Sequence, residues 1–94
     1  MAEVKIFKLE FGEKAMARVR GKIVRFLGIR YLEGEGMCLL AECLDEVGEV
    51  EWGIYEIGEG RRIERSWIYL GRGVYPAGSV AKTEVGMNYY GVLL

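Results

Sequence analysis

Glycine spacing is the feature that most limits how this chain can fold. The sequence holds 14 glycines among 94 residues, and they separate short segments rich in Val, Ile, Tyr and Trp. This punctuation is typical of antiparallel strands joined by turns. A chain of 94 residues also fits a single domain. The sequence therefore predicts one all-β domain spanning residues 1–94, built from about six strands.

Alternating apolar and charged residues indicate where these strands lie. The first, near Val4 to Phe11, places Phe7, Leu9 and Phe11 on one face and is expected to end in a hairpin turn at 12–14. The run Met37 to Leu44 is almost wholly apolar and predicts a central strand buried on both faces. Further strands are expected at 50–57, 63–70 and 83–94, with a tight hairpin loop at 58–60 and an irregular connection at 71–78.

The second strand starts near Ala15 and is the most ambiguous. Ala17 and Val19 alternate with basic residues, as in a strand, but the apolar residues of this stretch also lie close to helical spacing. Gly21 in the middle favours a long, bent strand, because a glycine inside a strand commonly marks a bend or a barrel corner. Short twisted strands with such bends predict a small antiparallel, OB-like barrel that is partly open.

Residue types argue against a catalytic or metal site. The chain has no histidine, so a Ser or Cys nucleophile lacks its usual base, and two cysteines alone cannot complete a zinc site. Cys38 and Cys43 are five steps apart on one extended segment, too far for a disulfide, and are expected to be buried. The Gly34-Glu35-Gly36 and Gly71-Arg72-Gly73 segments superficially resemble a phosphate loop, but neither is followed by a predicted helix, as such a loop requires. We expect no enzyme activity, no cofactor, no metal and no small-molecule substrate.

Charges are segregated along the chain. Every charged side chain from Lys14 to Arg30 is positive, and every one from Glu33 to Glu59 is negative. Two interpretations stay open: oppositely charged strands pair across the sheet, or the domain has a basic and an acidic face that dock on a charged partner. The basic strand with Arg18, Arg20 and Lys22 is a possible nucleic-acid face.

Aromatic residues are concentrated in the second half of the chain. Neighbours on a strand point to opposite faces, so at least one of Tyr89 and Tyr90 is expected at the surface. Exposed Tyr and Trp beside Arg suit a protein interface or a base-stacking platform. The candidate partner-binding residues are Trp67, Tyr69, Arg72, Tyr89 and Tyr90.

Three segments, Gly36–Leu44, Trp67–Tyr75 and Asn88–Leu94, resemble a known family. They are similar to the central strands and the Tyr-Gly-Gly-Leu-Leu signature of the small OB-fold subunit of eukaryotic RNA polymerases, a family that also has an archaeal member. The similarity extends over about Lys14 to Leu94, and Val92 stands where the signature has its second glycine. The resemblance implies a non-catalytic subunit of DNA-directed RNA polymerase that docks on the largest subunit and supports assembly.

Composition agrees with an archaeal source. Glutamine is absent, Asn88 is the only asparagine and Asp45 the only aspartate, a bias that suits a hyperthermophile. No apolar run reaches the roughly 18 residues that span a bilayer, and the N-terminal residues lack the apolar core of a secretion signal, so we expect a cytoplasmic protein without membrane contact. The alternative function is that of a free-standing OB-type protein that binds single-stranded nucleic acid.

Overall fold

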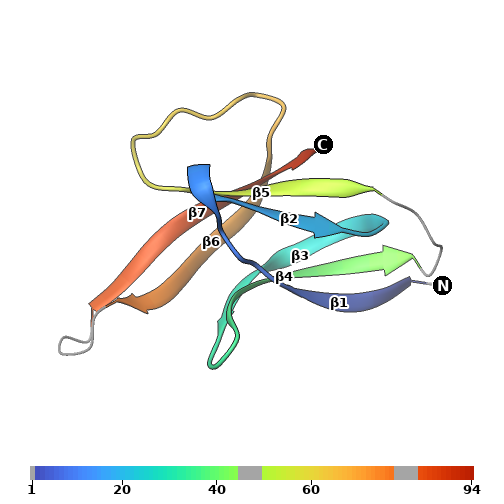
Figure 1. The fold of residues 1–94 in the computed structure, drawn as a ribbon, viewed down its shortest axis with the longest axis horizontal. Helices are drawn as coiled ribbons and strands as arrows, with labels where there is room; N and C mark the ends of the chain where they lie inside the picture. Colours follow the sequence, from blue (N-terminus) through green and yellow to red (C-terminus); the bar gives the residue numbers. More distant parts are fainter. Residues whose placement is uncertain (1, 45–49, 78–82) are drawn as a thin grey trace.

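The computed structural model describes residues 2–44, 50–77 and 83–94. Over these residues the chain forms seven strands and one short 3₁₀ turn (Figure 1). In chain order they are β1 (Ala2–Lys8), η1 (Glu13–Ala15), β2 (Met16–Arg20), β3 (Ile23–Leu32), β4 (Gly36–Leu44), β5 (Glu51–Ile57), β6 (Ile68–Ala77) and β7 (Thr83–Leu93).

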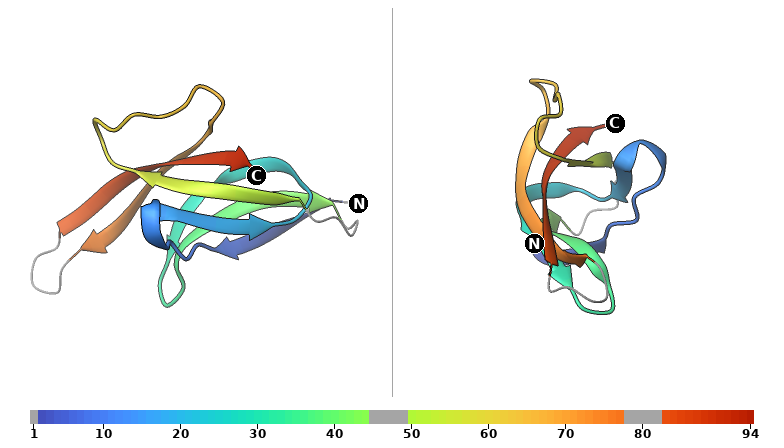
Figure 2. Two further views of the ribbon diagram at one scale, coloured as in Figure 1. Left: turned by 45° about the horizontal axis from the view of Figure 1, so that its top comes forward. Right: turned by 90° about the vertical axis from the view of Figure 1, so that its left-hand side faces the viewer.

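The strands form two antiparallel sheets. One has three strands in the order β1-β4-β3, and the other has four in the order β2-β5-β7-β6. Strand β3 also packs against β6, which brings the two sheets together on one side. Along the described part of the chain, β1 and β2 end their sheets without pairing to each other. The result is a partly open antiparallel barrel, which confirms the predicted fold class (Figure 2).

The bend expected at Gly21 is where the chain changes sheets. Strand β2 ends at Arg20 and belongs to the four-stranded sheet, whereas β3 begins at Ile23 and belongs to the three-stranded sheet. The Gly21 amide donates to the Val50 carbonyl at 2.9 Å, so the corner is also held by the residue that precedes β5. The segment is therefore extended, and the helical alternative for it is wrong.

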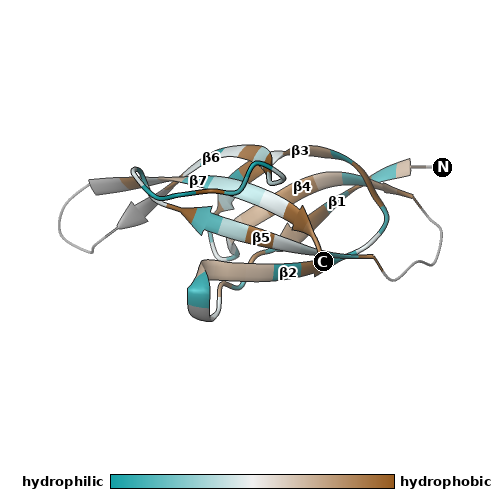
Figure 3. Cartoon of the chain, turned by 90° about the horizontal axis from the view of Figure 1, so that it is seen from above, coloured by the Kyte–Doolittle hydropathy of each residue, from teal (hydrophilic) through white to brown (hydrophobic). Residues whose placement is uncertain are grey.

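The core lies between the sheets. Its fully buried side chains include Leu39 of β4, Ile54 of β5 and Tyr89 of β7. Ala17 and Val19 face this core while Arg18 and Arg20 face outward, as the alternation predicted. In Figure 3 hydrophobic and hydrophilic stretches alternate along the strands, whereas the loop between β5 and β6 is mostly hydrophilic. Strand β4 is central in its sheet, as predicted, but it is not buried on both faces. Its core-facing residues Met37, Leu39, Ala41 and Cys43 are buried, whereas on the other face only Cys38 is buried and the rest are half-buried.

Two predicted hairpins are wrong. Strand β1 pairs with β4 and not with β2, so the turn after Gly12 joins strands of different sheets. Strands β5 and β6 both pair with β7, so the 58–60 segment begins a long connection and not a tight hairpin. A hairpin requires strands that are consecutive in the chain to pair with each other. Here the strands pair in the order that lets their apolar faces meet in the core.

Strand β6 lies later in the chain than the sequence predicts. It occupies Ile68–Ala77, not 63–70, so most of the expected irregular connection is strand. The register of β6 shifts between Tyr69 and Gly71, and Gly71 has φ +127°. The glycines of this segment are not loop punctuation: Gly71 accommodates a bulge, and Gly73 allows close packing against the core.

Candidate functional site

The outer face of the four-stranded sheet carries a row of aromatic residues. Tyr90 of β7 lies opposite Tyr55 of β5 on one side and opposite Tyr69 of β6 on the other. Trp67, which precedes β6, adds a fourth ring. We call these four residues, Tyr55, Trp67, Tyr69 and Tyr90, the aromatic row.

Ring contacts connect the members of the row. The Trp67 and Tyr55 rings are stacked, with centroids 4.3 Å apart and planes 10° from parallel. Trp67 also contacts Tyr90 at 6.3 Å, and Tyr69 contacts Tyr90 at 5.2 Å. Such pairs contribute about 0.5–1.5 kcal/mol beyond their buried area. The row is therefore a connected surface and not a set of independently moving side chains.

Tyr69 is the most accessible member of the row. Its side chain is 55% exposed, while the other three members are half-buried. The Tyr69 hydroxyl donates a hydrogen bond to Oδ1 of Asn88 at 3.1 Å, which fixes the direction of the ring. An exposed, oriented tyrosine offers a partner a flat apolar face at a low cost in side-chain entropy.

Apolar residues extend this face beyond the row. On the same side of the sheet, Met16, Val92 and Leu94 converge over Gly53, which has no side chain to separate them. Leu94 is 55% exposed. The outer face thus presents aromatic and aliphatic surface side by side, a composition found at the centres of protein interfaces.

The rim of this face is charged. Glu51 accepts hydrogen bonds from Arg18 at 2.8 Å and from Arg20 at 3.2 Å. The hydrogen bond from Arg20, followed in size by the one from Arg18, holds the pKa of the Glu51 carboxyl below its ordinary value. On the other edge, Arg72 donates to Glu59 at 3.4 Å. Arginines are present at both edges: Arg18 and Arg20 share the single carboxylate of Glu51, and Arg72 is paired with Glu59.

These contacts decide between the two interpretations of the charge pattern. The basic strand β2 pairs with the acidic strand β5, and the basic β3 pairs with the acidic β4, where Arg25 lies 4.0 Å from Glu42. Oppositely charged strands therefore pair across each sheet, as the first interpretation predicted. No separate basic and acidic faces are needed to explain the segregation.

The structure brings together three of the predicted partner-binding residues. Trp67, Tyr69 and Tyr90 belong to the aromatic row, and Arg72 lies next to it, across from Asn88. Tyr89 does not reach this surface: it is fully buried and donates a hydrogen bond to Glu56. One of the two adjacent tyrosines points outward, as predicted, and the register identifies it as Tyr90.

Tyr55 is the member of the row that the sequence analysis missed. It lies on β5, twelve positions before Trp67 in the chain, and its position opposite Tyr90 depends on the pairing of β5 with β7. A sequence signal did exist, because Tyr55 alternates with the core residue Ile54 and must face outward. Assigning it to the site required the strand order.

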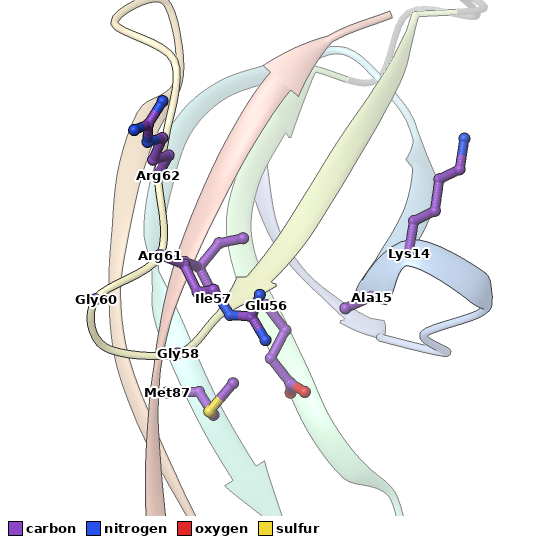
Figure 4. A pocket seen from close by; sticks show the side chains of 9 residues that line it. All are labelled: Lys14, Ala15, Glu56, Ile57, Gly58, Gly60, Arg61, Arg62 and Met87. Carbon is purple, nitrogen blue, oxygen red and sulfur yellow. The ribbon is translucent and has the colours of Figure 1, made fainter.

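A second feature is a pocket at the end of β5 (Figure 4). Its lining includes Glu56 and Met87 together with Lys14, Arg61 and Arg62. Figure 4 shows that the Lys14 and Arg62 side chains lie on opposite sides of the opening and extend away from it. The cations therefore do not converge on one point, as an anion site requires.

The two cysteines and the acidic residues form no reactive or metal-binding site in the described part of the chain. Cys38 and Cys43 are buried, as expected, and burial raises the pKa of both thiols. Within residues 2–44, 50–77 and 83–94, no three Cys, Asp or Glu side chains are grouped so as to hold a metal ion. None of the described segments forms a helix long and apolar enough to cross a membrane.

Comparison with known proteins does not assign the chain to a group. No family model, no curated protein and no solved structure matches it.

Proposed function

We propose that this chain is a non-catalytic structural subunit of an archaeal DNA-directed RNA polymerase, which docks on the largest subunit and supports assembly. One observation carries the proposal: the last of the three segments that resemble the family, Asn88–Leu94, contributes to the outer face of the four-stranded sheet that carries the aromatic row. Tyr90 belongs to the aromatic row, and Asn88 orients Tyr69. A signature located at a docking surface is what a role in assembly requires.

The composition of this face supports a protein partner. Aromatic residues surrounded by aliphatic ones and a polar rim are the usual arrangement of an interface centre. In this proposal the partner's apolar surface covers the aromatic row, and Arg72 lies at the edge of the contact. Activity then resides in the polymerase, and the chain itself works in the cytoplasm without cofactor or metal.

Affinity capture from an archaeal extract tests the proposal. The tagged wild-type chain is expected to retrieve the large polymerase subunits, identified by mass spectrometry. Tyr69→Ala is expected to reduce that recovery at least about tenfold, the loss typical of a central interface aromatic. Tyr31→Ala is the matched control, because Tyr31 is also exposed, at 38%, but lies on β3 of the other sheet. Capture without any large polymerase subunit contradicts the proposal.

The alternative is a single-stranded nucleic-acid binder, and the aromatic row is the observation in its favour. Bases stack on exposed aromatic rings, and β2 supplies Arg18 and Arg20 nearby, with Lys22 at the corner that follows. Glu51 weighs against it, because its carboxylate already pairs with Arg18 and Arg20 and offsets one of their two charges. A labelled oligonucleotide separates the two functions: the alternative requires binding at low salt that weakens steeply as salt rises.

A further inference from the structure

Among the residues that the structure describes, the first strand has no partner at one of its edges. Strand β1 is the end of the three-stranded sheet, and its other edge is paired with β4. Nearly all of its residues are exposed, including Val4 at 58% and Ile6 at 60%. An exposed edge with apolar side chains is a template for pairing with another strand.

The hydrogen-bond pattern shows which backbone groups are available at this edge. Leu9, which continues the register of β1, donates to the Met37 carbonyl at 2.9 Å. In an antiparallel ladder, alternate residues bond to the same neighbour, so residues 3, 5 and 7 bond to β4. The N–H and C=O groups of Ala2, Val4 and Ile6 therefore point away from β4, toward the open edge.

The charged residues of β1 indicate that its open edge pairs with a second copy of the same strand. Glu3 and Lys5 lie on one face of β1, with the Lys5 amine 3.7 Å from the Glu3 carboxylate. When two copies of β1 pair antiparallel around Val4, Glu3 of each copy lies opposite Lys5 of the other. Val4 then meets Val4, and Ala2 meets Ile6, through the backbone groups that the edge leaves open. We propose that the chain forms a two-fold dimer through β1, paired around Val4.

Other registers of the β1–β1 pair bring the charged residues into less favourable positions. Pairing around Lys5 places the two Lys5 amines opposite each other, and pairing around Ile6 places Lys5 opposite Phe7 and Val4 opposite Lys8. Opposite charges attract and like charges repel across a strand pair, so the Val4 register is selected. This register also places the exposed Val4 and Ile6 side chains of both copies on one face, where Ile6 lies beside Leu40 of β4.

The other open edge cannot associate in this way. Strand β2 also ends its sheet, but its charged residues are Arg18 and Arg20. Pairing two copies around Val19 places Arg18 opposite Arg20, and pairing around Arg18 places it opposite itself. Like charges thus protect this edge, as lysine-rich edges do in other sheets. Self-association is confined to β1, which joins the two three-stranded sheets into one continuous sheet.

Sedimentation over a range of concentrations and salt tests the dimer in the full chain. Strand pairing alone buries less surface than a permanent interface, so we expect a reversible monomer–dimer equilibrium that weakens with salt. Lys5→Glu turns two attractive contacts into repulsive ones and is expected to raise the dimer dissociation constant about tenfold. Lys8→Glu is the matched control, because it changes the net charge equally but position 8 has no partner in this register. Its dimer dissociation constant should equal that of the wild type.

Mixing variants tests the register itself. Glu3→Lys and Lys5→Glu chains should each associate weakly alone, whereas an equimolar mixture should form a mixed dimer, because every charged position then faces the opposite sign. Val4→Pro removes only an outward N–H, so the fold should persist while the dimer is lost. A wild-type chain that stays monomeric throughout, or a dimer unaffected by Lys5→Glu and Val4→Pro, overturns the proposal. Neither result bears on the polymerase assignment, which rests on the other sheet.

Discussion

The Tyr89 hydroxyl donates a hydrogen bond to Oε2 of Glu56 at 2.7 Å, which ties the core to the rim of the barrel. Tyr89 is completely buried, whereas Glu56 is only half-buried and lines the pocket at the end of β5. Because β5 and β7 place these residues opposite each other, the bond crosses two neighbouring strands on the inner face. A buried tyrosine thus satisfies its polar atom at the edge of the core.

Tyr89→Phe is expected to lower the free energy of unfolding by about 1 kcal/mol, since it keeps the ring in place and removes a hydrogen bond. Urea unfolding followed by circular dichroism measures the change. Tyr90→Phe is the control, because within the described residues its hydroxyl has no hydrogen bond, and it should leave stability unchanged. Equal losses in the two variants would mean that the Glu56 contact contributes nothing.

Gly73→Ala is expected to be destabilising because β6 passes close to the core at this position. A Cβ there would lie 2.8 Å from Cε2 of Tyr89 and 2.9 Å from Cγ2 of Ile29, and it would clash with Cε of Met37. Overpacking of this kind costs about 1–3 kcal/mol. Thermal and urea unfolding measure the loss.

Gly12→Ala provides the comparison for Gly73→Ala. No heavy atom lies within 4 Å of a Cβ at Gly12, and its φ of −88° suits alanine. This variant should be as stable as the wild type or slightly more so. A Gly73→Ala protein of wild-type stability would show that β3 and β6 are not held together at this point.

Much of this fold could be predicted because alternation is a local property. The two-residue period placed Val19 inward and Arg18 outward without knowledge of the partner strand. Pairing is not local, and nothing in the residues of β5 specifies that β7, and not β6, lies beside it. The aromatic row was therefore predicted only in part: Trp67, Tyr69 and Tyr90 cluster near the C-terminal strands, but Tyr55 joins them only through that strand order.

Both cysteines are expected to resist alkylation while the chain is folded. Cys38 and Cys43 are each 1% exposed, and burial raises the pKa of both thiols, so the reactive thiolate is scarce. Labelling with iodoacetamide, followed by mass spectrometry, should be at least about 100-fold slower than in urea, because it requires opening of the sheet.

An exposed thiol is the internal reference for that experiment. Glu10→Cys introduces one at an exposed position between β1 and η1, and it should react at the rate of a free thiol while the two native cysteines stay protected. Rapid labelling of Cys38 or Cys43 in the same folded sample would show that β4 is not buried between its neighbours.

Stability is expected to fall in acid partly through Glu51. Hydrogen bonds from Arg20 and Arg18 lower the pKa of this carboxyl below its ordinary value of 4.5. A carboxyl whose pKa is lower in the folded than in the unfolded chain stabilises the fold above the unfolded pKa. This contribution disappears as the pH falls through the folded pKa. Glu51→Gln should therefore be less stable than the wild type at neutral pH, and the difference should close as the pH drops below about 4.5.

Urea unfolding across this pH range, at low and high salt, measures the Glu51 contribution. The arginine side chains are 66% and 64% exposed, so salt should screen the interaction and shrink the difference at neutral pH. Glu10→Gln is the control, because Glu10 is exposed and, among the described residues, belongs to no ion pair. A difference between wild type and Glu51→Gln that does not change with pH would trace the loss to packing, because only the ionised carboxylate can hold both arginines of β2.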